Sequence, residues 1–157
     1  TAGFNTGFSW KNFDFSMQWT GAWNVDRMLD EFRRPLGDTN EKGLLLYQYD
    51  TTWRSSADTF TAKFPRTSSL HASNNYAGSD LYLINASYLR LKSVEIGYNF
   101  NFPFMKKLKM DNCRLYVNGY NLITITGFKW GDPESRQSSR PNYPLTRVFN
   151  IGLKLGF

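Results

Sequence analysis

The chain has 157 residues, and 19 Lys and Arg residues against 13 Asp and Glu residues give it a formal net charge of +6. A single cysteine excludes a disulfide framework and a cysteine-based zinc site, and a single histidine makes a histidine metal cluster or catalytic triad a poor fit. The longest uninterrupted apolar run, residues 44–47, is far shorter than the roughly 20 residues of a membrane helix. We therefore expect no enzyme, no catalytic or metal site, no cofactor and no nucleic-acid partner.

Aromatic residues make up 17% of the chain although its mean hydropathy is −0.50, because aromatic and polar residues alternate. From residue 13 to residue 23 the odd positions are apolar or glycine, and the even positions are polar or small. Successive side chains of a β-strand point to opposite faces, so this pattern predicts a strand with one apolar face. Residues 4–10 repeat the pattern, and Lys11 and Asn12 fit a two-residue hairpin turn between the two strands.

The same alternation returns in the second half of the chain. Its parity changes between Leu91 and Val94, which a β-bulge near Lys92 and Ser93 would explain. The sequence therefore predicts an all-β chain of five antiparallel strands, at about residues 3–10, 12–24, 85–102, 112–126 and 145–157.

The connections between these strands alternate between short and long. The turn at 11–12 and the basic connection 103–111 are short, whereas 25–84 and 127–144 are long. This alternation is typical of a transmembrane β-barrel, with short periplasmic turns and long extracellular loops, and it places the C-terminus in the periplasm. The lysines of the short connection suit solvent or lipid headgroups; they are Lys106, Lys107 and Lys109.

The long segment 25–84 shows little periodicity, so we expect a packed loop with small aromatic clusters. At its start, Asn24 is expected to cap a short helix. The apolar face of that helix would hold Val25, Met28, Leu29 and Phe32.

Alternation by itself also fits a soluble β-sandwich, whose strands bury one face as well. Two features favour lipid. Trp10, Trp19 and Trp23 lie near predicted strand ends, where indole rings suit the membrane–water boundary. The predicted strands are also longer than the usual five or six residues of a globular sheet, which suits a tilted membrane crossing.

Several motifs resemble the C-terminal portion of SusC/RagA-type TonB-linked outer-membrane transporters. They are Ser79-Asp80 followed by SYLRLKSV at 87–94 and Gly97-Tyr98, then Tyr116-Val117, Gly119, Asn121-Leu122 and Thr124, GDPE at 131–134, Tyr143-Pro144, and the ending GLKLGF at 152–157. Trp53-Arg54 and Pro65-Arg66 match a weaker upstream stretch. The resemblance covers roughly residues 50–157.

The resemblance implies a barrel of 22 strands, of which this chain would supply about the last five. It also implies an N-terminal plug that is absent from this chain, a SusD-like lipoprotein lid, the TonB complex and outer-membrane lipid as partners. Five strands cannot close a barrel, so we interpret the chain as a fragment that rests against further strands of its own barrel. A terminal aromatic is similar to the signal read by the barrel-assembly machinery, which here would comprise Gly152, Leu153, Leu155 and Phe157.

The candidate site residues form three groups. Polar alternating positions are expected to face the barrel lumen; they are Asp14, Gln18, Arg114, Tyr116, Asn118 and Tyr120. Loop aromatics could contact substrate or pack the loops; they are Trp53, Tyr76, Tyr82 and Trp130. For Asp132 and Glu134 a structural role is favoured over a metal or glycan contact, and for Arg90 and Lys92 lumen electrostatics or loop packing is favoured over ligand binding.

The function that the resemblance implies is TonB-dependent import of oligosaccharides or peptides together with a SusD-like lipoprotein. One alternative is a complete, structural or adhesive outer-membrane barrel of eight strands, which would need three more strands within residues 25–84. A second alternative is a soluble all-β glycan-binding module.

Overall fold

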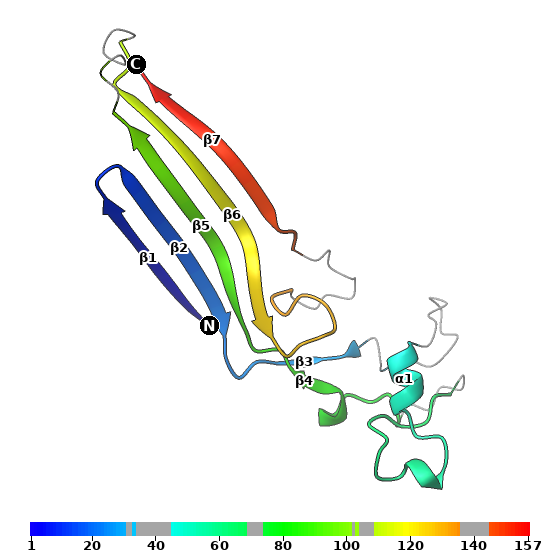
Figure 1. Ribbon diagram of the computed structural model, residues 1–157. Coiled ribbons are helices and arrows are strands. Elements are labelled where there is room, and N and C mark those ends of the chain that lie inside the picture. Colours follow the sequence, from blue (N-terminus) through cyan, green and yellow to red (C-terminus); the bar gives the residue numbers. More distant parts are fainter. Residues whose placement is uncertain (31–32, 34–44, 69–73, 102, 104–108, 136–144) are drawn as a thin grey trace. The chain divides into compact units, whose positions relative to one another are not determined.

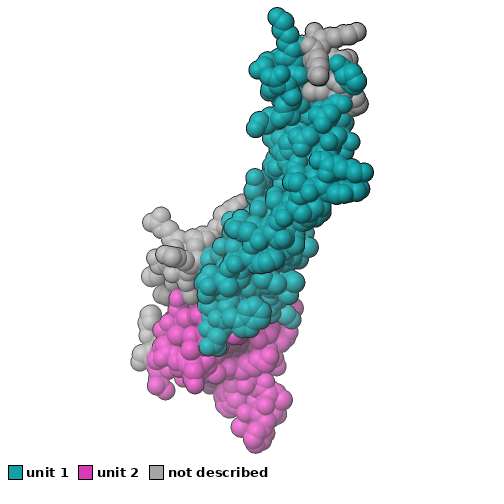
Figure 2. Space-filling view, turned by 90° about the vertical axis from the view of Figure 1, so that its left-hand side faces the viewer, with its two compact units in different colours: residues 1–25, 86–157 teal, residues 26–85 magenta. Residues whose placement is uncertain are grey.

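A computed structural model describes residues 1–30, 33, 45–68, 74–101, 103, 109–135 and 145–157 (Figure 1). The chain divides into two compact units (Figure 2). The first comprises residues 1–25 and 86–157, and the second comprises residues 26–85. No helix in the described ranges is long and apolar enough to cross a membrane.

The first unit is a single antiparallel sheet with the strand order β1-β2-β5-β6-β7 (Figure 1). Its strands are β1 (Ala2–Trp10), β2 (Phe13–Ala22), β5 (Tyr88–Phe100), β6 (Asn112–Thr126) and β7 (Val148–Gly156). The five antiparallel strands lie within a few residues of their predicted bounds. Trp10 pairs with Phe13, so Lys11 and Asn12 form the expected two-residue turn.

The register of the sheet places the apolar positions on one face. Directly paired residues share a face, and one row across all five strands holds Phe8, Phe15, Ile96, Val117 and Ile151. The described residues of this unit form no second layer over that face, and Phe8 is 57% exposed and Ile151 78% exposed. A sheet face of this kind is stable only when another apolar layer covers it.

A bulge interrupts β5 at Lys92, as the change of parity predicted. Gln18 and Trp19 of β2 are consecutive, but they pair with Ser93 and Leu91 of β5, so Lys92 is an extra residue. On the other side, Leu91 and Ser93 pair with Ile123 and Tyr120 of β6, so β6 carries a further extra residue relative to β5. The bulge turns Leu91 onto the apolar face while Ser93 stays on the polar one.

The second unit contains only short elements in its described part. They are β3 (Asp26–Met28), α1 (Leu46–Thr51), the 3₁₀ turns Ser56–Asp58 and Asp80–Tyr82, and β4 (Leu83–Asn85). Tyr82 is 1% exposed and stacks on Phe64, with ring centroids 5.8 Å apart. Tyr47 meets the same Phe64 ring edge-on at 6.1 Å, which completes a small aromatic cluster.

The predicted helix after Asn24 is wrong. Asn24 has a φ of 53°, and Asp26–Met28 forms strand β3, which pairs antiparallel with β4. The backbone N–H of Leu29 donates to the carbonyl of Tyr82 (2.9 Å), which extends this pairing. Phe32 lies outside the described residues. Because β3 and β4 have three residues each and form a sheet of their own, the described part of 25–84 does not supply the three long strands of an eight-stranded barrel.

We predict that Gly21→Ala destabilises the protein by about 1–3 kcal/mol, the usual effect of overpacking. A Cβ at Gly21 would lie 2.7 Å from the backbone oxygen of Tyr88, which cannot move without disturbing the β2–β5 ladder. Gly3→Ala is the matched control, because its Cβ would lie 3.7 Å from the nearest oxygen. Thermal unfolding followed by far-UV circular dichroism measures both, and equal losses would contradict the prediction.

Candidate functional site

The face opposite the apolar rows is polar, and all six residues predicted to face a lumen lie on it. On β2 and β6 these are the even-numbered positions Asp14, Gln18, Arg114, Tyr116, Asn118 and Tyr120. Residues from neighbouring strands complete the face, and the pairing of Gln18 with Ser93 and of Ser93 with Tyr120 fixes the register of one row.

Arg114 is the centre of an ion cluster on this polar face. Its guanidinium donates two hydrogen bonds to the Asp14 carboxylate and one to Glu95 (2.8 Å). Asn99 donates to Asp14 (3.3 Å), and Asn118 donates to Glu95 (3.2 Å). Side chains thereby join the three strands β2, β5 and β6, and the carboxylates of Asp14 and Glu95 share the guanidinium of Arg114.

Two further contacts shape this region of the face. Asn150 of β7 donates to the amide oxygen of Asn118 (2.9 Å), which extends the network to a fourth strand. Arg114 lies flat against the sheet because Gly97 leaves space beneath it; a Cβ there would be 2.3 Å from the guanidinium. The result is a hydrogen-bonded polar wall rather than a cavity with an unpaired charge.

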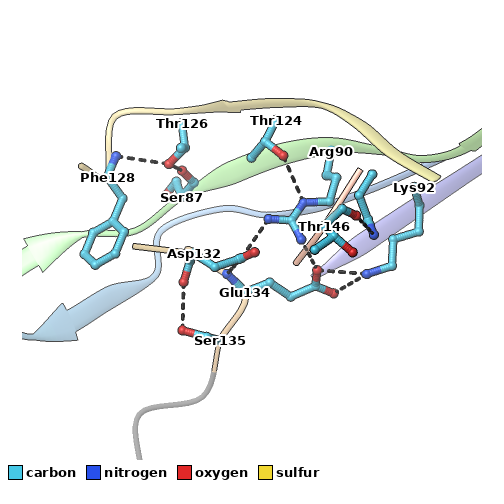
Figure 3. A network of polar contacts seen from close by, with 11 residues as sticks. Ser87, Arg90, Lys92, Thr124, Thr126, Phe128, Asp132, Glu134, Ser135 and Thr146 are labelled. Carbon is cyan, nitrogen blue, oxygen red and sulfur yellow. Dashed lines mark hydrogen bonds and ion pairs between the residues drawn. The ribbon is translucent and has the colours of Figure 1, made fainter. Parts of the chain in front are cut away.

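A second network lies at the other end of the sheet, where β5 begins (Figure 3). Arg90 is 2% exposed, and its guanidinium donates to Thr124 (3.0 Å), Asp132 (2.7 Å) and Glu134 (2.8 Å). Lys92, the bulge residue, donates to both oxygens of Glu134 (3.0 and 2.9 Å). Two cations on β5 thus hold two acids of the segment that follows β6.

The backbone around Asp132 fits this arrangement. Its carboxylate also accepts the backbone N–H of Glu134 (2.9 Å), and its carbonyl accepts the Ser135 hydroxyl (2.9 Å). Burial opposes ionisation of Asp132, but the hydrogen bonds from Arg90 and from the Glu134 backbone, together with the Arg90 charge, hold its pKa below the ordinary value. A buried Arg is tolerated only when such partners satisfy it, so the geometry favours a structural role for these four charged residues.

The four loop aromatics lie in different surroundings. Tyr82 is buried and donates to the backbone oxygen of Asn75 (2.6 Å), so it packs the second unit. The Tyr76 hydroxyl bonds to the backbone of Ser68 in the same unit. Trp53 is 36% exposed, and Trp130, in the first unit, is partly exposed.

The last strand carries the residues predicted as an assembly signal. Leu153, Leu155 and Phe157 are exposed apolar side chains, and the first two continue the apolar rows of β7. Gly152 lies on the polar face opposite Tyr116. Their role as an assembly signal stays a prediction.

Glu95 and Asn150 were missed among the polar-face residues, although alternation in their strands could have placed them there. The pairing of Arg90 and Lys92 with Asp132 and Glu134 joins residues about 40 positions apart, and no local pattern signals it. Within the described residues, no group of His, Cys, Asp and Glu side chains could hold a metal ion.

The chain was compared with family models and with known proteins. No family model matches it, whereas curated proteins match over its whole length. The chain is 29% identical over 174 residues to TonB-dependent receptor P3 of Formosa agariphila, and 27% identical over 157 residues to TonB-dependent receptor SusC of Bacteroides thetaiotaomicron. These matches cover 100% and 99% of this chain but only 16% and 15% of the relatives' own lengths.

Solved structures show the same fold. Structures of the RagAB peptide importer match with a TM-score of 0.72, and the match covers 99% of this chain and 17% of the importer chain. The sequence identity is 23% to the open-open state and 22% to the closed-closed state. The whole chain is thus similar to SusC/RagA-type proteins, as its motifs predicted. Its fold class is confirmed as antiparallel strands of a TonB-dependent transporter barrel.

Two of the motifs that carry this similarity bind each other. SYLRLKSV supplies Arg90 and Lys92, and GDPE supplies Asp132 and Glu134. The two motifs therefore supply the four charged residues of the network in Figure 3.

We predict that Asp132→Asn destabilises the protein by about 1–3 kcal/mol at pH 7, because it weakens a charged hydrogen bond to a buried guanidinium. The folded-state pKa of Asp132 lies below its ordinary value of 3.8, so the carboxylate contributes its full stability above that value. That contribution is lost as the pH falls through the lowered pKa.

Equilibrium unfolding at pH 7, 5, 4 and 3 measures this effect. The difference between the native protein and Asp132→Asn should be constant down to about pH 5 and then shrink. Asp111→Asn is the control, because it removes an exposed carboxylate of the same unit. The role of Asp132 would be refuted if the difference in unfolding free energy grew on acidification. It would also be refuted if Asp111→Asn destabilised the protein as much as Asp132→Asn.

Proposed function

We propose that this chain forms part of the barrel wall of a TonB-dependent outer-membrane importer, with hydrocarbon against its apolar face and the aqueous lumen against its polar face. The observation that carries the proposal is the single-layer sheet itself. All five strands put apolar residues on one face, and in the described part of this unit no protein layer covers them. The hydrocarbon of a lipid bilayer would cover this apolar face, so no second protein layer is needed.

The polar face suits a water-filled lumen. Arg114, Asp14 and Glu95 are bound to one another but remain partly exposed, with side-chain exposures of 19%, 28% and 32%. Such a cluster would be costly against hydrocarbon, where charges are desolvated. The hydrogen-bonded wall also gives the barrel side-chain links across strands in addition to its backbone ladders.

The edge strands support the interpretation as a barrel segment. Among the described residues, β1 pairs only with β2, and β7 pairs only with β6, so each has one side without a strand partner. Unpaired backbone groups in a bilayer cost several kcal/mol each. We infer that further strands of the same barrel, together with a plug, complete the protein, and that its C-terminus faces the periplasm.

For the whole protein we propose uptake of oligosaccharides or peptides with a SusD-like lipoprotein, driven through the TonB complex. The similarity to TonB-dependent receptor SusC and to the RagAB peptide importer supports this class of transport. Folding of the barrel would use the barrel-assembly machinery. The partly exposed loop residues Trp53 and Trp130 are the candidates for contact with the substrate.

Membrane exposure is tested by Ile151→Arg against Asn150→Arg in the intact protein. These neighbours lie on opposite faces of β7, and Ile151 is in a central row of the sheet. Ile151→Arg should cost about 2–4 kcal/mol of folding stability in lipid vesicles, as arginine does near a bilayer midplane. Asn150→Arg should cost clearly less, and equal costs would exclude a hydrocarbon cover on the Ile151 face.

Transport is tested by uptake of labelled oligosaccharides and labelled peptides into cells that produce the intact protein. We expect accumulation of one of the two classes that stops when TonB is deleted, because import needs energy from the inner membrane. A strain without the intact protein is the control. Uptake that persists without TonB would contradict the proposed mechanism even if the barrel spans the membrane.

A further inference from the structure

The turn end of the sheet combines aromatic rings with two unusually placed lysines. This end is defined by the β1–β2 turn, the end of β5, the start of β6 and the end of β7 (Figure 1). Asn12 accepts the backbone N–H of Asn99 (2.7 Å), and Asp111 donates its backbone N–H to Gly156 (2.9 Å), so these segments adjoin.

Aromatic side chains border the apolar face at this end. Trp10 pairs with Phe13, and Phe13 pairs with Tyr98 on the next strand. The Tyr98 and Phe100 rings meet at 4.9 Å, and Trp10 is 65% exposed. Indole and phenol rings in such a row are typical of the depth at which hydrocarbon gives way to headgroups.

Lys11 and Lys109 occupy backbone positions that disfavour their residue type. Among the described residues, only four other than glycine have a positive φ. Two are asparagines, which tolerate the left-handed region, and the other two are Lys11 (φ 53°) and Lys109 (φ 54°). Both lysines lie at the turn end, where asparagine or glycine would fit the backbone better. This strain indicates that their side chains serve a purpose other than forming the turns.

The charge at this end is suited to an anion. The Lys11 ammonium lies 4.8 Å from the centre of the Trp10 ring, at the border of the apolar face. Asp111 is the one acidic side chain among the described turn residues 11–12 and 109–111, against the two lysines. The two nearby cations of the strands are placed differently. Arg114 is bound to Asp14 and Glu95. Lys154 is the cross-strand neighbour of Arg114 in the β6–β7 register, so it also lies on the polar face.

We propose that Lys11, with the Trp10 ring beside its ammonium group, and Lys109 form a binding surface for the headgroups of anionic phospholipids in the leaflet that the short turns face. The proposal rests on the proposed function, because hydrocarbon must cover the adjoining apolar face. The ammonium groups bind the headgroup phosphates, and the aromatic row fixes their depth. Lys106 and Lys107 lie outside the described residues and are not part of this surface.

The test compares the intact protein with a Lys11→Asn, Lys109→Asn double variant. Native mass spectrometry during titration with phosphatidylglycerol measures apparent affinity, and phosphatidylcholine is the zwitterionic reference. We expect the double variant to lose roughly fivefold in phosphatidylglycerol affinity for each lysine, with phosphatidylcholine binding unchanged. Lys154→Asn is the matched control, because it removes the same charge from the polar face and should keep the native affinity.

A second measurement separates lipid binding from damage to the turns. Asparagine suits the left-handed region, so in phosphatidylcholine vesicles the double variant should unfold at the same temperature as the native protein or a higher one. Unchanged phosphatidylglycerol affinity in the double variant, or an equal loss in Lys154→Asn, would overturn the proposal. A protein that inserts into vesicles without distinguishing the two lipids refutes this inference alone, whereas a protein that does not insert refutes the proposed function.

Discussion

The apolar face of the five-stranded sheet has to be kept from water, and the rest of the structure is arranged around that need. A sheet in a soluble protein meets it with a second layer of helix or strand. Here the rows through Ile96, Val117 and Ile151 meet no such layer within the described part of the first unit. Long strands, aromatic borders and the confinement of charged strand residues to the other face are what a hydrocarbon cover requires.

The charged side chains of this unit form two kinds of ion cluster, one partly exposed and one buried. On the open part of the polar face, Arg114 and its two carboxylates stay partly exposed to solvent. At the start of β5, Arg90 is buried, and it is neutralised by acids that a later segment of the chain supplies. The second arrangement ties the geometry of that segment to the strand, because separating them would leave a desolvated guanidinium without its two carboxylate partners.

The strands, their faces and the bulge at Lys92 could be predicted because each follows from a local repeat of two residues. Residues 26–28 could not, since a three-residue strand leaves no periodic signal and its partner lies more than fifty positions away. The contact between Arg90 and Asp132 depends on how the chain folds back after β6. Asp14 and Arg114 could be assigned to one face, but their direct bond depends on the register of β5 between them.

The bulge in β5 adds one residue to the strand, and that residue is itself the cation that reaches Glu134. Without Lys92, Leu91 and Ser93 would alternate regularly opposite Trp19 and Gln18, so the pairing of β2 with β5 would become more uniform. A shorter and more regular strand would thus keep its hydrophobic alternation but lose the contact between Lys92 and Glu134. In this sheet the irregular position therefore carries a side chain that holds the segment after β6, and removing the bulge would remove that contact.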